Sequence, residues 1–196
     1  MIKFKNVSVS FDGKSVFQNV SFELPKRGAF ALTGPSGCGK TTLMRILLGL
    51  ERGYTGTVSG LDGVLISAVF QEDRLLPWST AAQNVAAALP EGESPEKWLE
   101  LVGLGDFAES LPQELSGGMR RRVAIARALG FAVCRGAGVL LLDEAFTGLD
   151  AALKEDVISK INDLCKDKLI LLVTHDEREA ELMHAEKLVV FDDNPS

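Results

Sequence analysis

Residues 34–41 read Gly-Pro-Ser-Gly-Cys-Gly-Lys-Thr and lie between an apolar run at 29–32 and a helical pattern that starts at residue 42. Glycines at this spacing let the backbone curl so that successive N–H groups point inward at a phosphate, where side chains would obstruct it. The N-terminus of the following helix adds a positive partial charge. The stretch therefore predicts a strand, a phosphate-binding loop and a helix, in that order.

Two side chains at the end of this loop have the chemistry that a bound nucleoside triphosphate needs. Lys40 can reach the β- and γ-phosphates, and the hydroxyl of Thr41 can occupy a position on Mg²⁺. A glycine-rich turn that binds nothing is the alternative, but the strand and helix patterns on either side favour phosphate binding. The residues expected at the nucleotide are Gly34, Pro35, Ser36, Gly37, Cys38, Gly39, Lys40, Thr41 and Thr42.

Length and charge exclude several other classes of protein. With 196 residues, 46% of them hydrophobic, the chain can form one domain, or one domain with an insertion, around a substantial core. A net charge of −6 argues against a protein whose main partner is nucleic acid. No apolar run approaches the roughly 18 residues of a membrane span, and residues 1–5 do not resemble the start of a secretory signal. We therefore expect a cytoplasmic protein.

The first 24 residues alternate between apolar and polar side chains, which is typical of strands with one wet face. Asp12-Gly13 predicts a turn between two such strands, and the pattern indicates antiparallel pairing. Phe11, just before the turn, has two interpretations that the residues alone leave open. It is either the last core residue of its strand or an aromatic platform for a purine.

The rest of the chain alternates strand and helix patterns around a long stretch without strands. Strands are expected at 29–33, 54–60, 65–70, 139–144, 169–173 and 187–191, and helices at 40–50, 80–89, 95–102, 120–129, 151–165 and 176–184. Residues 131–138 are expected to form a loose loop. The pattern predicts an α/β fold in which residues 1–77 and 130–196 form a nucleotide-binding core and residues 78–129 an inserted helical subdomain with no strand.

Polar side chains follow the predicted parallel strands at their carboxyl ends, where parallel α/β sheets bind ligands. Asp143 can hold a metal through water, and Glu144 can orient and deprotonate an attacking water. Gln71 can contact both metal and water, and His175 can hydrogen-bond a γ-phosphate. Each alone is more typical of an ordinary loop residue. Because all four lie at equivalent strand ends, together they indicate a catalytic site.

A second stretch has the parts of an anion site: Leu115, Ser116, Gly117, Gly118 and Met119 precede a helix. They offer a hydroxyl, unobstructed backbone amides and a helix N-terminus. A simple helix cap is the alternative. One catalytic site and a second anion site on a separate helical arm suggest that two chains share each nucleotide, head to tail.

The order of these motifs closely resembles that of the ATP-binding subunits of ABC transporters. The resemblance covers nearly the whole chain and rests on residues 34–41, Gln71, 115–119, 139–144, 148–150 and His175. It implies a P-loop NTPase core with a mostly parallel central sheet, an N-terminal antiparallel β subdomain and an inserted helical subdomain. It also implies hydrolysis of ATP with Mg²⁺ in a sandwich dimer of two copies that encloses two nucleotides.

The same resemblance implies a role for individual residues. Glu144 is then the catalytic base, His175 the switch residue and Phe11 the residue that stacks on adenine. Asp150 belongs to the loop that links the two nucleotide sites, and Gln71 couples the metal to the membrane partner. Ser116 and Gly118 of one protomer close over nucleotide held by Ser36, Lys40 and Thr41 of the other.

Two positions depart from the family pattern. Met119 stands where Gln is usual, which removes a polar side chain but leaves the backbone amides of the second anion site, so we expect dimerisation to survive. Ala145 stands where Pro is usual and should only loosen the turn. Residues 131–138 also differ from the usual short link.

Residues 69–78 are similar to the same stretch in bacterial importers of nitrate, sulfonates, taurine and pyrimidine precursors. Leu75, Leu76 and Trp78 offer an apolar patch for a short helix of an integral membrane permease subunit, or they pack under the helical arm. The resemblance implies a peripheral protein on the inner face of the cell membrane, which also works indirectly with a solute-binding protein.

Two other functions stay open at this point. One is an ABC-type ATPase that is not coupled to transport, and the other is a P-loop enzyme such as a small-molecule kinase. The kinase would need an acceptor site and would have no need for residues 115–119. The basic run Arg120–Arg122 could suggest nucleic acid, but a solvated or ion-paired helix face fits an acidic protein better. We expect no nucleic-acid partner.

Overall fold

A computed structural model describes residues 1–35 and 37–189 of the chain. Its centre is a five-stranded parallel sheet in the order β5-β6-β7-β3-β8. Every residue of β6 and β7 is buried, which explains why these strands are continuous apolar runs: helices or another sheet cover both faces. The predicted parallel sheet is therefore confirmed. The strands are β3 (Gly28–Thr33), β5 (Ile66–Val69), β6 (Val139–Asp143), β7 (Leu169–Val173) and β8 (Glu186–Val189).

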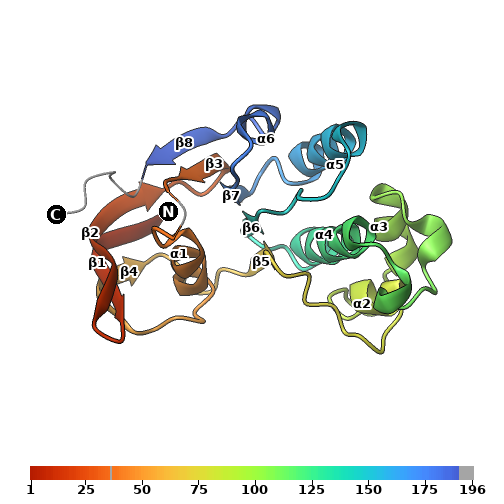
Figure 1. The fold of residues 1–196 in the computed structure, drawn as a ribbon, viewed down its shortest axis with the longest axis horizontal. Coiled ribbons are helices and arrows are strands. Elements are labelled where there is room, and N and C mark those ends of the chain that lie inside the picture. The colour runs from red at the N-terminus through yellow and green to blue at the C-terminus, as the bar shows by residue number, and fades with distance from the viewer. Residues whose placement is uncertain (36, 190–196) are drawn as a thin grey trace.

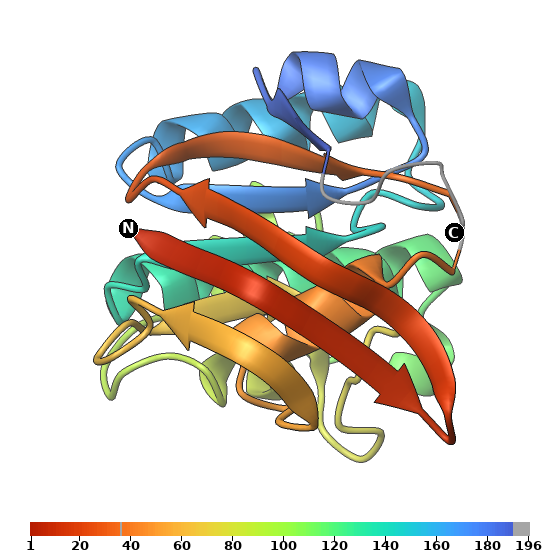
Figure 2. The ribbon, with the colours of Figure 1, turned by 90° about the vertical axis from the view of Figure 1, so that its left-hand side faces the viewer.

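A three-stranded antiparallel sheet lies beside it, in the order β2-β1-β4 (Figure 2). Its strands are β1 (Ile2–Phe11), β2 (Lys14–Leu24) and β4 (Tyr54–Ser59). The predicted turn between β1 and β2 is present, with φ of 50° at Asp12 and 76° at Gly13. Positive φ at both central residues is what a tight two-residue hairpin requires, and Asp-Gly supplies it at low cost.

Helices cover the parallel sheet, and the helical arm lies at the far end of the molecule from the antiparallel sheet (Figure 1). The helices are α1 (Lys40–Leu47), α2 (Ala81–Ala86), α3 (Pro95–Leu101), α4 (Gly117–Cys134), α5 (Ala151–Leu164) and α6 (Glu177–Leu182), with short 3-10 turns at Gly105–Phe107 and Pro112–Glu114. Ser94 caps α3 and Pro95 is its first residue, as the sequence predicts. None of the helices in the described ranges is long and apolar enough to cross a membrane.

The prediction of a loose loop at 131–138 is wrong for its first half, because α4 continues to Cys134. Ala132 is fully buried, and Gly130 lies so close to Leu89 and Trp98 that a Cβ would overlap Leu89 at 2.6 Å. Packing against the arm therefore keeps this weakly helical stretch folded. The chain leaves the helix only before Gly136, where φ is 69°.

Other predicted ends also differ by a few residues; helix α2, for example, ends at Ala86 rather than residue 89. Helix α1 ends at Leu47 rather than residue 50, because Gly49 adopts a left-handed conformation with φ of 68°. The last strand is described as far as residue 189, so the predicted residues 190 and 191 lie outside the described part of the chain.

The parallel sheet separates two apolar cores, and alternate residues of each central strand belong to different ones. Leu140 and Leu142 of β6 pack with α2, α3, α4 and α5, while Leu141 packs with α1 and the antiparallel sheet. The sheet is thus the middle of three layers. Both cores hold its strands in place, so the loops at their carboxyl ends start from a rigid edge.

Candidate functional site

The register of the parallel sheet brings the four predicted strand ends to one edge. Val69 of β5 lies beside Leu142 of β6, and Asp143 lies beside Val173 of β7. Val173 in turn lies beside Leu32 of β3. The residues that follow these strands are Gln71, Glu144, His175 and the loop from Gly34. They are therefore neighbours in space although up to about 140 residues apart in the chain.

The predicted phosphate loop wraps around the start of α1. Gly39 precedes the helix with φ of 106°, and a Cβ there would meet the ring of Phe17 at 2.6 Å, so only glycine fits. The side chain of Lys40 is buried, and its Nζ donates to the carbonyl oxygens of Gly34 at 2.8 Å and Pro35 at 2.7 Å. The ammonium group is thus held over the loop itself. The predicted contact of Ser36 lies outside the described residues.

Thr41 and Asp143 form the second part of the site. The Thr41 hydroxyl donates to Asp143 Oδ2 at 3.1 Å, and only 3% of Asp143 is exposed. Burial raises the pKa of Asp143, and the hydrogen bond from Thr41 opposes that shift only in part. A buried carboxylate beside a hydroxyl oxygen is the donor set that Mg²⁺ prefers, and a cation there would offset the cost of burying the charge. The residues therefore fit such an ion.

Glu144 is the residue on which two other predicted side chains, Gln71 and His175, converge. Its Oε2 accepts a hydrogen bond from Gln71 Nε2 at 3.3 Å, and its Oε1 lies 3.4 Å from His175 Nε2. Its backbone has φ of 48°, a left-handed conformation that costs about 1 kcal/mol or more outside glycine, and its N–H donates to Val173 at 2.9 Å. The carboxylate is thus aimed at the sheet edge by a strained turn rather than by a free loop.

A hollow of about 310 Å³ opens beside Glu144. His175 lines it with its side chain 59% exposed, so the ring is free to meet a ligand. The other lining residues come from the loops after β6 and β7 and the helices that follow them: Phe146, Thr147, Gly148, Leu149, Lys154, Thr174, Asp176 and Glu179.

The loop that carries His175 is anchored by a network that sequence reasoning missed. Buried Glu179 accepts from the Thr174 hydroxyl and lies 2.7 Å from Lys154 Nζ, which is also 2.9 Å from Asp176 Oδ2. The bond to Glu179 raises the pKa of Lys154, and the bond from Lys154 lowers the pKa of Asp176. Several charged residues of α5 and α6 look alike in the sequence, so no local signal distinguishes the pair that turns inward.

The second anion site begins α4. Ser116 is the N-cap and its Oγ accepts from the Met119 N–H at 3.2 Å, while Leu115 is buried and Ser116 and Gly117 are exposed. Gly118 lies directly against the next predicted motif, because a Cβ there would be 2.7 Å from the Gly148 carbonyl oxygen. Met119 is partly buried and packs against the core of the arm.

Asp150, the last residue of the 148–150 motif, caps α5. Its Oδ1 accepts from the Leu153 N–H at 3.0 Å. The motif therefore joins three parts of the site: it contacts the start of α4 through Gly148, it begins α5, and it follows the Glu144 turn by only a few residues.

The three arginines that follow residues 115–119, Arg120–Arg122, bind backbone carbonyl groups and Asp73. They do not form a free basic face. Arg120 and Arg121 lie 3.9 Å and 3.2 Å from Asp73, and Arg122 donates to the carbonyl oxygens of Val102 and Gly103 at 3.0 Å. The ion-paired interpretation of this run is confirmed for the first two residues.

Phe11 is 45% exposed, so its interpretation as a core residue is wrong, and its ring is available to a ligand.

The residues of the predicted apolar patch after Gln71 differ in their exposure. Leu75 packs partly into the core, whereas Leu76 is 40% and Trp78 77% exposed. The predicted apolar surface in this segment therefore consists of Leu76 and Trp78.

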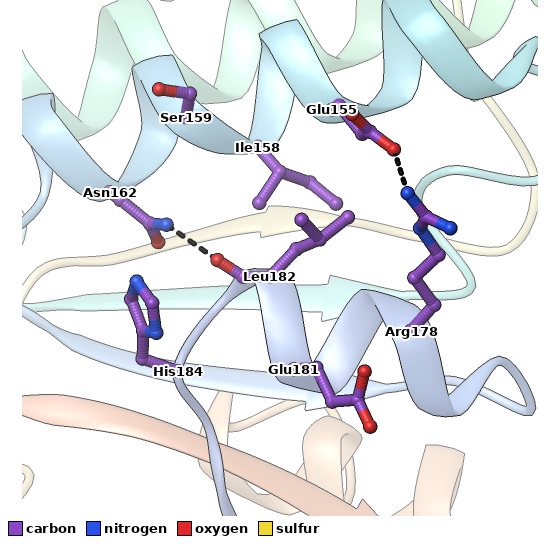
Figure 3. Close-up of a pocket in the computed structure, with 8 residues that line it drawn as sticks. All are labelled: Glu155, Ile158, Ser159, Asn162, Arg178, Glu181, Leu182 and His184. Carbon is purple, nitrogen blue, oxygen red and sulfur yellow. Dashed lines mark hydrogen bonds and ion pairs between the residues drawn. The ribbon is translucent and has the colours of Figure 1, made fainter.

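A separate hollow of about 520 Å³ lies between α5 and α6 and contains none of the predicted site residues (Figure 3). An ion pair between Glu155 and Arg178 lies at one end, and Asn162 donates to the Leu182 carbonyl oxygen at 2.8 Å at the other. Across residues 1–35 and 37–189, no group of three or more His, Cys, Asp or Glu side chains is placed to hold a metal without a ligand's help.

A glycine-rich loop between β3 and α1, with Thr41 bonded to the aspartate that ends β6, defines a P-loop nucleoside triphosphatase. The particular family follows from comparison with known proteins. Residues 17–147 match the model of the ABC transporter family, and the chain belongs to this family as one of its ATP-hydrolysing subunits.

Curated relatives agree over most of the chain. It is 41% identical to the aliphatic sulfonates import ATP-binding protein SsuB 1 of Pseudomonas savastanoi pv. phaseolicola, over 95% of this chain and 78% of that protein. It is 40% identical to the aliphatic sulfonates import ATP-binding protein SsuB of Bacillus cereus, over 84% of this chain and 69% of that protein.

Solved structures agree with the fold. The ATP-binding cassette MJ0796, in a dimeric post-hydrolysis state bound to ADP and Pi, is 26% identical, with a TM-score of 0.78 over 97% of this chain and 94% of that one. A second structure, described as dimeric MJ0796, a bacterial ABC transporter cassette, is 28% identical with a TM-score of 0.77 over 93% of this chain and 91% of that one. The predicted fold class and family are both confirmed.

Proposed function

We propose that this protein hydrolyses ATP to drive an importer of small anionic or organic solutes, of which organic sulfonates are the first to test. The observation that carries the proposal is the convergence of Gln71 and His175 on the Glu144 carboxylate, beside the Thr41–Asp143 pair. Relatives at about 40% identity that are named as sulfonate import ATP-binding proteins support the solute class.

In the proposed mechanism each residue at the sheet edge has a separate role. Lys40 leaves its two loop carbonyl groups and binds the β- and γ-phosphates. Thr41 and Asp143 would hold Mg²⁺, which would neutralise charge that develops on the phosphates. Glu144 orients the attacking water and accepts its proton, and Gln71 and His175 orient the Glu144 carboxylate and the γ-phosphate. Phe11 stacks on the adenine.

We propose that two copies enclose two ATP molecules head to tail. Ser116 and Gly117 are exposed and Gly118 is partly exposed at the start of α4, which supports a role toward nucleotide held by the other copy. Both MJ0796 structures are dimers. Asp150 and Gly148 then connect the two nucleotide sites, because Gly148 contacts Gly118 directly.

We also propose that the exposed side chains of Leu76 and Trp78 bind a short helix of an integral membrane permease subunit. This would place the protein on the inner face of the cell membrane, and a solute-binding protein would be an indirect partner that supplies solute to the permease. The division into a core (1–77 and 130–196) and a helical subdomain (78–129) remains part of this proposal. Helix α4 is continuous across residue 129, so the two parts would share it.

The test is the oligomeric state of Glu144→Gln by light scattering, with and without Mg-ATP. Hydrolysis is suppressed in this variant, so a closed sandwich should accumulate, and a shift from monomer to dimer only with Mg-ATP is the expected result. A monomer under all conditions, even with co-expressed permease subunits, would overturn the shared-site mechanism. Failure of the wild-type protein to co-purify with any integral membrane protein would instead favour an ABC ATPase that is not coupled to transport.

A further inference from the structure

The five residues that follow β5, 70–74, are bound to α4 mainly through their backbone carbonyl groups, together with the ion-paired side chain of Asp73. Carbonyl oxygens of Phe70 and Gln71 accept hydrogen bonds from the guanidinium of Arg121. Arg127, almost two turns further along α4, donates to the carbonyl oxygens of Asp73 and Arg74 at 2.9 Å each. Two arginines of one helix therefore hold four carbonyl groups around Gln71.

Arg121 is an unusual residue to bury for purely structural reasons. Only 8% of it is exposed, and its charge faces Asp73, whose Oδ1 lies 3.2 Å away. A buried guanidinium is tolerated only where its donors are satisfied, and its planar fork suits two successive carbonyl oxygens. Because both peptide planes beside Gln71 are bound, the direction in which the Gln71 side chain leaves the backbone is fixed as well.

The position of Arg121 in α4 gives this contact a functional meaning. It lies five residues after Ser116, near the start of the helix, and Gln71 donates to Glu144 at 3.3 Å. A continuous chain of contacts therefore runs from the exposed start of α4, through Arg121 and Gln71, to the Glu144 carboxylate. Contiguous contacts of this kind are a physical route by which two sites can be coupled.

We propose that Arg121 is a positioning residue that sets the orientation of Gln71 toward Glu144 and so links the second anion site of α4 to the hydrolytic site of the same protomer. Arg127 supports it by fixing the following peptide groups. This inference rests on the proposed function, because the proposed function assigns Gln71 and Glu144 their roles in hydrolysis. It goes beyond that function by assigning a transmitting role to a residue that contacts no nucleotide.

The test compares Arg121→Met with Arg135→Met. Arg135 lies at the other end of α4 and donates to the Leu89 carbonyl oxygen at 2.8 Å, so the control removes the same charge and a similar bond far from Gln71. We expect Arg121→Met to lower kcat for ATP about tenfold with KM changed by less than about twofold, because ATP itself is not contacted. Arg135→Met should stay within about twofold in both values.

A double-mutant cycle distinguishes positioning from general loss of structure. If Arg121 acts through Gln71, the variant Gln71→Ala/Arg121→Met should be no slower than Gln71→Ala within about twofold. Arg121→Lys, which keeps the charge but not the fork, should recover only part of kcat. The inference would be overturned if the two substitutions lowered kcat by factors that multiply in the double variant. It would also be overturned if kcat of Arg121→Met lay within about twofold of wild type.

Hydrogen exchange without nucleotide gives a readout independent of hydrolysis. Amides of residues 71–76 should exchange faster in Arg121→Met than in wild type, while those of α5 should not change. Equal exchange at 71–76 would show that Arg121 does not hold this segment. If the wild-type protein and Arg135→Met hydrolyse no ATP, the proposed function fails, whereas the exchange result still decides whether Arg121 holds Gln71.

Discussion

Helices α1 and α4 both start beside glycines, since α1 follows Gly39 and α4 begins with Gly117, yet their first turns differ. No side chain in the described residues caps α1, and the loop before it folds over the Lys40 ammonium group. The first turn of α4 is capped by Ser116, carries no acidic residue and has no lysine folded over it, and Ser116 and Gly117 are exposed. In the proposed function, the start of α1 is a complete phosphate site within one chain, whereas that of α4 is only half of one.

The surroundings of the two helix starts explain the difference. Gly39 packs on Phe17 of the antiparallel sheet, and Asp143 meets Thr41 in the first turn of α1, so that turn is built into the core. The first turn of α4 contacts the Gly148 loop on one side and is open on the other. A helix start that is supported but left open is suited to a ligand that arrives on another chain.

The largest effect on hydrolysis should come from Glu144, the proposed base beside the nucleotide site at the start of α1. Glu144→Gln removes the proposed base but keeps a similar shape, so kcat should fall by roughly 10² to 10⁴ fold while ATP binding persists. Steady-state hydrolysis and equilibrium binding of a fluorescent ATP analogue measure the two quantities. Glu155→Gln, on the exposed ion pair with Arg178, is the control and should hydrolyse normally. Near-normal turnover of Glu144→Gln would remove this residue from the role.

The next effect separates the two helix starts directly. Lys40→Ala deletes a charged donor at the α1 site and should weaken ATP binding about 10- to 100-fold, since hydrogen bonds to charged groups contribute roughly 1.5–3 kcal/mol. Ser116→Ala should leave the ATP affinity of the isolated protomer within about twofold of wild type, because Ser116 is proposed to contact nucleotide held by the other copy. Titration of each variant with ATP, at protein concentrations too low for dimerisation, measures both affinities. Equal losses in the two variants would contradict the division between a complete and a half site.

A smaller effect, on stability, should distinguish the two glycines of the α4 start. Gly118→Ala places a Cβ 2.7 Å from the Gly148 carbonyl oxygen, so the protein should lose about 1–3 kcal/mol of unfolding free energy as the backbone shifts. Gly117→Ala meets only the end of a flexible arginine at 3.9 Å and should be neutral or stabilising by up to about 1 kcal/mol. Urea denaturation measures both. Two equally stable variants would mean that the first turn of α4 does not rest on the Gly148 loop.

The same comparison shows how far the sequence could predict the site. The α1 site is encoded locally, in eight consecutive residues between a strand and a helix, and the strand-end residues follow from the rule that parallel strands present ligand groups at one edge. Gln71, Asp143, Glu144 and His175 could therefore be predicted as neighbours before any coordinates existed.

What the sequence could not provide depends on contacts between distant segments. Arg121 lies in a run of three arginines, and nothing local indicates that it alone turns inward to the carbonyl groups beside Gln71. The pairing of Lys154 with Glu179 is hidden for the same reason. The end of α4 was misjudged because the packing of Gly130 and Ala132 against the arm, rather than helix propensity, decides it.

The smallest effect concerns the departure at residue 119. Met119 packs partly against the core of the arm, and Ser116 Oγ contacts its backbone N–H rather than its side chain. Met119→Gln restores the side chain usual in the family but adds no backbone donor, so ATP-driven dimerisation in the Glu144→Gln background should change by less than about threefold, or about 0.65 kcal/mol. Light scattering over a range of protein concentrations measures it. A much stronger dimer would show that the side chain at 119 contributes to the half site, and the backbone alone would then no longer explain how the α4 start binds nucleotide.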